Sequence, residues 1–155
     1  MKKKHITITG LPFFYGKHPF EGNEYIVLTK DFANPHDSEA IIAETALWGM
    51  VGFVSNHPLS RIKGTISAGR LYDKIGKRAV AKVKFSTDEY VICKVVKGKR
   101  AKKQLKKFDA SRKDIKALEN MLPMDSDISH ITVHILSSSW QQDLPGGNAN
   151  GFWER

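Results

Sequence analysis

The chain has 155 residues and a mass of 17.4 kDa, which suits one domain with a real core and a short appendage. Its hydrophobic fraction of 41% is that of an ordinary globular protein and excludes wholesale disorder. The 25 Lys and Arg against 16 Asp and Glu give a formal charge of +9, which favours polyanionic partners and nucleic acid above all.

One cysteine, Cys93, excludes disulfides and cysteine-based zinc sites, and its apolar surroundings (YVICKVV) indicate a core position more than a reactive thiol. The basic start MKKKHITITG has too short an apolar stretch for a secretion signal. No window reaches the roughly 18 consecutive apolar residues of a membrane span. We therefore expect a soluble, cytoplasmic protein that does not associate with membranes.

Short apolar runs separated by turns predict strands in the first third of the chain. They cover residues 5–11, 24–30, 38–49 and 49–56, with a helix as the alternative for 38–49 and a loop at 13–25. In the first strand, Ile6 and Ile8 should face a core, and Thr7 and Thr9 should face away.

The period changes after Pro58, and residues 58–76 indicate helical pieces. Ser67 is a plausible N-cap of a helix at 68–75, with Gly76 as its stop. Two alternating runs then predict a hairpin. They cover residues 79–86 and 90–97, joined by the short link TDE.

Beyond this hairpin we expect a separate extension. It holds an amphipathic helix at 111–122, capped by Ser111 with Ile115, Leu118 and Leu122 as its apolar stripe, then a strand at 130–136 and a Gly- and Asn-rich tail. The expected fold is mainly β: a small OB-like β-barrel with two or three accessory helices at 1–96, and a C-terminal α/β extension at 97–155.

The likeliest boundary is the basic link between these parts, because residues 94–108 hold eight basic residues and no acidic one. Its candidate phosphate contacts are Lys97, Lys99, Arg100, Lys102, Lys103, Lys106 and Lys107. A solvated, partly frayed segment without a specific partner is a nearly equal alternative.

Three consecutive aromatic residues, Phe13, Phe14 and Tyr15, follow Gly10, Leu11 and Pro12. Neighbouring side chains on a regular strand point to opposite sides, so at least one of the rings should be exposed or line a groove. Such a ring could stack on a nucleobase, which contributes on the order of 1 to 3 kcal/mol per base. The alternative is that two rings are in the core and the third packs under a loop.

The stretch FANPHDSEAI, residues 32–41, sets Asn34, His36 and Asp37 between two apolar runs. Asn and Asp beside a proline most often bond their own backbone in a turn, and ligand binding or catalysis with Asp31 are the alternatives. No P-loop or nucleophile elbow is present, and His130 and His134 on a strand would lie about 13 Å apart, too far to share a metal. We predict no catalytic residues, no metal and no cofactor.

Taken in order, TGLPFFYG, KDFANPHDSEAI, MVGFVSN and GTISAGRLYDK resemble the HIRAN domain family over roughly residues 5–96. This family occurs alone in bacteria and phages, and fused to helicases and chromatin-remodelling ATPases. The resemblance implies an OB-like barrel that binds DNA, with a preference in the characterised eukaryotic member for a free 3′ end of a single strand.

By this resemblance Phe13 matches a base-stacking aromatic, and Asn34 and Asp37 match the polar element that receives the terminal nucleotide. A carboxylate there would accept a hydrogen bond from a 3′ hydroxyl and repel a 3′ phosphate. The chain departs from the eukaryotic pattern at three positions: Pro12 replaces an Arg, His36 a stacking Tyr, and Phe53 a His. Further candidate phosphate contacts are Arg61, Lys63, Arg70 and Lys74.

We therefore expect a non-catalytic nucleic-acid-binding module for single-stranded DNA or a DNA 3′ end, in DNA repair, replication or mobile-element biology. A helicase, nuclease or other DNA-processing protein is a possible partner. The first alternative is a protein-interaction or regulatory module that uses the basic segment and the tail GFWER. The second, ranked well below, is a metal-dependent nuclease.

Overall fold

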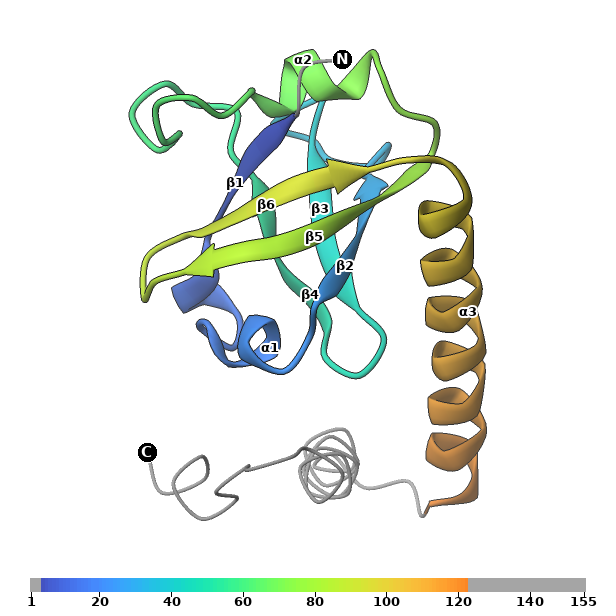
Figure 1. Cartoon of the computed structure of the whole chain (residues 1–155). Coiled ribbons are helices and arrows are strands. Elements are labelled where there is room, and N and C mark those ends of the chain that lie inside the picture. Colours follow the sequence, from blue (N-terminus) through green and yellow to red (C-terminus); the bar gives the residue numbers. More distant parts are fainter. Residues whose placement is uncertain (1–3, 123–155) are drawn as a thin grey trace.

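The computed structural model describes residues 4–122, in which six antiparallel strands form a closed barrel (Figure 1). The strands are β1 (His5–Thr9), β2 (Tyr25–Lys30), β3 (Ile41–Thr45), β4 (Gly49–Val54), β5 (Arg78–Ser86) and β6 (Val91–Val96). Their order around the barrel is β1-β4-β3-β2-β5-β6, and β1 closes it by pairing with β6. The expected mainly β, OB-like barrel is confirmed, and residues 41–45 form a strand and not a helix.

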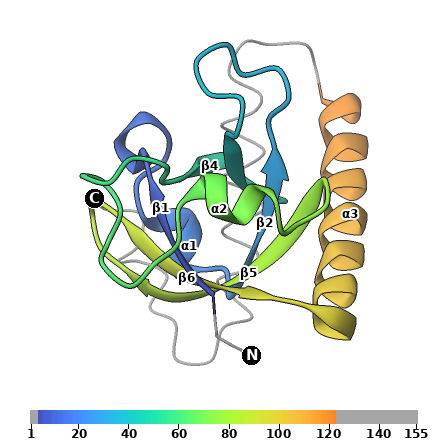
Figure 2. The same cartoon turned by 90° about the horizontal axis from the view of Figure 1, so that it is seen from above.

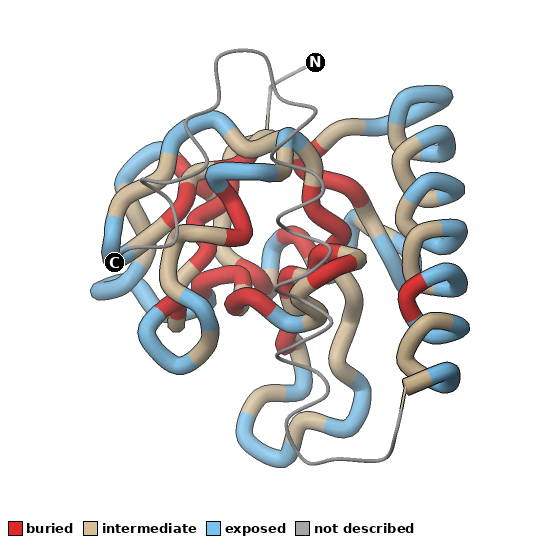
Figure 3. Tube along the Cα trace, turned by 90° about the horizontal axis from the view of Figure 1, so that it is seen from below, coloured by how far each residue is buried: buried red, intermediate tan, exposed pale blue. Residues whose placement is uncertain are grey.

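Alternating apolar side chains fill the barrel, as their period of two predicts. The core includes Ile6, Ile8, Ile26, Leu28, Ile41, Val51, Val91 and Cys93. In Figure 3 the buried segments of the strands lie mostly toward the middle of the barrel. The β5–β6 hairpin is present as expected, and its link is closed by a hydrogen bond from the Thr87 amide to the Tyr90 carbonyl (2.8 Å).

Thr7 faces away from the barrel interior as predicted, yet it is fully buried, because the segment around Thr65 covers it. The two threonine hydroxyls lie 2.7 Å apart, and the Ile62 amide donates to the Thr7 hydroxyl (3.1 Å). The outer face of β1 is therefore a second, polar packing surface.

Three short helical segments accompany the barrel. They are η1 (Leu11–Phe13), α1 (His18–Glu21) and α2 (Ala68–Tyr72). Of these, α1 lies in the stretch expected to be a loop, and η1 spans the end of the expected first strand and the start of that loop. Ser67 caps α2 as predicted, since its hydroxyl accepts from the Arg70 amide (3.3 Å), but the helix ends four residues before Gly76.

The basic segment, expected to link the barrel to an extension, is helical. It forms the first half of one continuous helix, α3 (Gly98–Met121), and Ser111 lies inside this helix and does not cap it. Residues 98–110 contain Lys, Arg, Ala, Gln and Leu, which are strong helix formers, and no breaker after Gly98. The predicted strand at 130–136 and the tail lie outside the described residues.

Helix α3 lies along one side of the barrel, next to β2 and β5 (Figure 2). Arg78 of β5 binds Asp109 through two hydrogen bonds (2.7 and 3.1 Å), and Arg112 donates to the Ala46 carbonyl (3.0 Å). Ile115 is buried, whereas Leu118 of the predicted stripe is only half-buried. A cavity of about 180 Å³ remains between α3 and the barrel, beside Phe108. The helix is thus attached to the barrel at several points.

Candidate nucleic-acid interface

Phe13 is held outward by the turn that follows β1. Gly10 adopts φ 79°, a left-handed conformation that favours glycine, and the chain then enters the single turn of η1. Leu11 is fully buried and anchors this turn, while amides of Phe13 and Gly16 bond back to the carbonyls of Gly10 and Leu11 (3.1 and 3.0 Å). The Phe13 side chain is 87% exposed, so one ring of the triplet is exposed as predicted.

The other two rings of the triplet pack against the barrel. Phe14 contacts Phe53 with ring centroids 5.7 Å apart, and Tyr15 contacts Trp48 at 4.8 Å. Phe53 faces outward from β4, between Thr9 of β1 and Ile42 of β3. The structure therefore brings the predicted residues Phe14 and Phe53 together, and exposed Phe13 precedes Phe14 in the chain.

The polar loop between β2 and β3 is built by its own side chains. Asn34 Oδ1 accepts from the amides of His36 (2.9 Å) and Asp37 (3.0 Å), and Asp37 Oδ1 accepts from the Glu39 amide (2.9 Å). Asp31 Oδ1 accepts from the Ala33 amide in the same way (3.2 Å). These bonds are those of the turn that the sequence favoured first. The His36 side chain is exposed.

Asp37 also has a long-range role, because it ties the loop to β4 and α2. Its Oδ2 atom accepts from the Asn56 side-chain amide (3.3 Å), and Asn56 Oδ1 accepts from the Gly69 amide (2.9 Å). The sequence interpretation assigned no role to Asn56, although it ends the stretch MVGFVSN. The bonds join positions 19 and 13 residues apart, and no local pattern encodes them.

The aromatic and polar groups are close along the chain. Phe53 and Asn56 are three residues apart, and an extended chain spans at most about 3.6 Å per residue, so their Cα atoms are separated by no more than about 11 Å. The structure thus joins the sequence-predicted residues into two groups: Phe14 with Phe53, next to Phe13 in the chain, and Asn34 with Asp37. Phe53 belongs to β4, and Asn56, which bonds to Asp37, follows this strand.

Three of the four further basic side chains expected to contact phosphate, which are Arg61, Lys63 and Arg70, differ in their contacts. The Arg61 guanidinium donates to the Thr65 carbonyl and closes its own loop. Lys63 and Arg70 are exposed, and no carboxylate among residues 4–122 pairs with either. Lys63 and Arg70 are therefore better placed than Arg61 to bind a phosphate.

The basic residues of α3, with Lys97 just before the helix, form a separate surface, away from the aromatic group. Its exposed members are Lys97, Lys99, Arg100, Lys102, Lys103, Lys106 and Lys107. The side of the helix toward the barrel carries less polar residues, among them Ala101, Leu105 and Phe108. The alternative of a frayed segment is overturned, since these cations are fixed on a helix.

Other chemical groups in the described part of the chain are few. Cys93 is buried, and desolvation raises the pKa of its thiol to about 12, so little reactive thiolate forms. Among residues 4–122, no three His, Cys, Asp or Glu side chains are arranged to hold a metal ion. No helix in the same part is long and apolar enough to cross a membrane.

Comparisons of the chain with protein-family models, with curated proteins and with solved structures gave no match.

Proposed function

We propose that this protein is a non-catalytic module that binds single-stranded nucleic acid, with Phe13 as the stacking residue. The observation that carries this proposal is the 87% exposure of Phe13 on a turn anchored by buried Leu11. An aromatic ring held in water by a fixed turn gains contact area when a base stacks on it, and it accepts any base. The resemblance to the HIRAN family supports the same assignment.

Other features of the described region suit a nucleic-acid strand. Phe14 packs on Phe53, and Lys63 and Arg70 are exposed cations without a carboxylate partner among the described residues. The net charge of +9 favours approach of a polyanion. Stacking would then give a preference for single strands over duplexes, and the cations would supply most of the salt-dependent affinity.

The experiment compares Phe13→Leu with Phe13→Trp in binding a fluorescent single-stranded oligonucleotide. Both variants keep a large apolar side chain at this position, but only Trp can stack on a base. Loss of stacking worth about 1 to 3 kcal/mol should weaken binding by Phe13→Leu about 5- to 150-fold, and Phe13→Trp should bind like the wild type. Equal affinity of all three proteins would show that Phe13 does not stack.

A finer proposal concerns the strand end. The Glu39 amide and the Asn56 side chain hold the Asp37 carboxylate in place, and a carboxylate retains capacity for a further donor such as a 3′ hydroxyl. We expect oligonucleotides with a free 3′ hydroxyl to bind more tightly than 3′-phosphorylated ones, and Asp37→Asn to reduce that difference. Equal affinity for the two ends would remove end reading but leave single-strand binding intact.

A further inference from the structure

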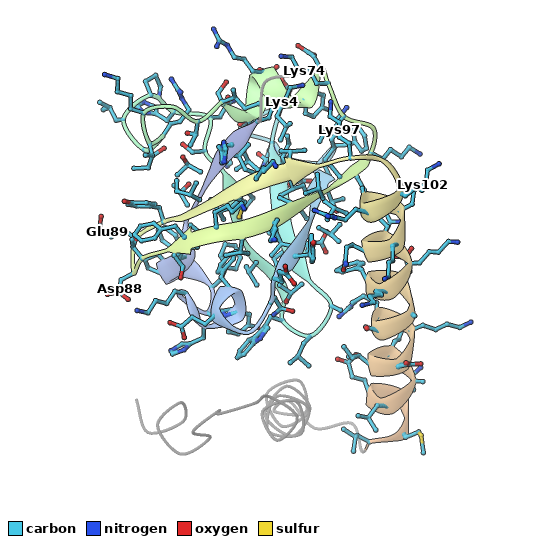
Figure 4. All side chains as sticks on the ribbon, in the orientation of Figure 1. Lys4, Lys74, Asp88, Glu89, Lys97 and Lys102 are labelled. Carbon is cyan, nitrogen blue, oxygen red and sulfur yellow. The ribbon has the colours of Figure 1, made fainter. Side chains whose placement is uncertain are left out.

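Three lysines from separate parts of the sequence meet at one end of the barrel. Lys4 precedes β1, Lys74 follows α2, and Lys97 lies between β6 and α3; we call them the lysine cluster. Figure 4 shows all three at the end of the barrel where α2 lies, and Lys102 near the start of α3. In the same view Asp88 and Glu89 lie at the far tip of the β5–β6 hairpin.

The fold itself brings the cluster together. Because β1 and β6 are antiparallel neighbours, the start of one adjoins the end of the other, and the Val95 amide bonds to the Lys4 carbonyl (2.9 Å). The segment leading into α2 is fixed to the same strand by a bond from the Ile66 amide to the His5 carbonyl (2.8 Å). No sequence pattern indicates this convergence.

The cluster is electrostatically unfavourable for the protein alone. The pKa of Lys4 is below its ordinary value, first through desolvation and then through the positive charges of Lys97 and Lys74. None of the three lysines has a carboxylate at ion-pair distance within residues 4–122. An anion bound there would relieve this repulsion.

The basic face of α3 continues from the cluster. Lys99, Lys103 and Lys106 are exposed at spacings of four and three residues, so they share one side of the helix over about 10 Å. The first turn of α3 contains no acidic residue, although the helix dipole favours acids there and disfavours lysines. The helix dipole therefore gives no reason for placing lysines in this turn.

We propose that the lysine cluster and the basic face of α3 bind the phosphate backbone of a nucleic-acid duplex, as a second contact in addition to the single-strand site. This inference rests on the proposed function. In a substrate where a single strand continues from a duplex, the aromatic group would hold the single strand and the lysines would hold the duplex.

A duplex is favoured over a second single strand for two reasons. Phe108 is the one aromatic residue of α3 among the described residues, and it lines the cavity between the helix and the barrel. The exposed basic face therefore offers cations without a stacking ring. A duplex also carries about one charge per 1.7 Å of its axis, twice the density of one strand, which suits closely spaced lysines on a rigid helix.

The test uses the full chain, a blunt duplex and a single strand of the same length, with affinities measured over a range of salt concentrations. The cluster variant is Lys4→Gln with Lys74→Gln. Its matched control is Lys84→Gln with Lys116→Gln. This control removes the same charge from exposed positions outside the lysine cluster and outside the face of α3 that carries Lys99, Lys103 and Lys106. Circular dichroism melting checks that both variants fold.

For the duplex, log affinity falls as log salt rises, and the cluster variant should make this slope less steep by about 1.8, or about 0.9 for each lost phosphate contact. The control variant should leave the slope unchanged. Lys4→Arg with Lys74→Arg should keep wild-type duplex binding, and Phe13→Leu should not alter it. Equal losses in the cluster and control variants would overturn the inference, because only total charge would matter.

The two proposals fail in different ways. A wild-type protein that binds the single strand but not the duplex would overturn this inference and leave the proposed function standing. Duplex binding that depends on the cluster, without any single-strand binding, would support the lysine site and overturn the proposed function of Phe13.

Discussion

Gly52 lies where β4 passes closest to β1 and to the turn that carries Phe13. A Cβ atom at this position would lie 2.7 Å from Ile8 Cγ2, 2.8 Å from the Thr9 carbonyl oxygen and 3.4 Å from Leu11 Cδ2. The first two distances are shorter than any normal contact, and one involves backbone, which cannot rotate away. The absence of a side chain at Gly52 therefore allows β4 to pack this closely against β1, just before the turn that carries Phe13.

We predict that Gly52→Ala lowers the free energy of unfolding by about 1 to 3 kcal/mol, because the extra methyl group forces β1 and β4 apart. Urea denaturation measures this change. The control is Gly22→Ala, where no atom lies within 4 Å of the added Cβ and φ is −95°, so its effect should be near zero or slightly stabilising. Equal effects of the two substitutions would contradict the close packing at Gly52.

A second residue-scale prediction concerns the buried threonine pair. Thr7→Val keeps the shape of the side chain but leaves the Ile62 amide without its acceptor and removes a hydroxyl bonded to Thr65. We expect a loss of about 1 to 3 kcal/mol in unfolding free energy, and a smaller loss for Thr7→Ser, which keeps the hydroxyl. The same denaturation experiment tests both, and a Val variant as stable as the wild type would rule out this role.

At the scale of elements, α3 is held to the barrel partly by the Arg78 and Asp109 pair. The pKa of the Asp109 carboxyl is below its ordinary value, first because Arg78 donates hydrogen bonds to it. A carboxyl with a lowered folded-state pKa stabilises the fold above its ordinary pKa, near 3.9, and this contribution is lost as pH falls through the lower value. Since Asp109 is more than half exposed, solvent screening limits the pair to about 1 kcal/mol or less.

We predict that Asp109→Asn is less stable than the wild type at pH 7, and that the difference between them shrinks as pH falls below about 4. Urea denaturation at several pH values gives this difference. Asp114→Asn, on an exposed part of the same helix, should show no such convergence. A pH-independent difference for Asp109→Asn would mean that Arg78 does not stabilise the carboxylate.

The strands were predictable from sequence because a period of two directly encodes which side of a sheet is buried, as in HITIT and VICKVV. The length of α3 was not, since Ser111 has the chemistry of an N-cap and only packing against the barrel shows that the helix runs through it. The candidate site likewise has features that the sequence predicts and features that it does not. Exposure of one ring of the triplet followed from local geometry, whereas Asn56 and the lysine cluster depend on contacts between distant segments.

At the scale of the whole molecule, Cys93 reports on the integrity of the barrel. Its thiol is fully buried with a pKa of about 12, so alkylation requires opening of the core. We predict that iodoacetamide at pH 8 labels the native protein about 10³-fold or more slowly than the chain in denaturing urea, as a stability of 5 kcal/mol or more implies. Rapid labelling of the native protein, measured by mass spectrometry, would instead show local opening of β6.

The closed barrel also limits how other proteins can be recognised. An open sheet offers an edge strand to which a partner's extended segment adds by β-augmentation. Here each of the six strands has two neighbours, and the start of β1, which pairs with β4 only at Ile8 and Thr9, is covered by Ile66 through a bridge to Ile6. Partners of this barrel must therefore be selected by side chains on its loops and helices, and not by backbone pairing.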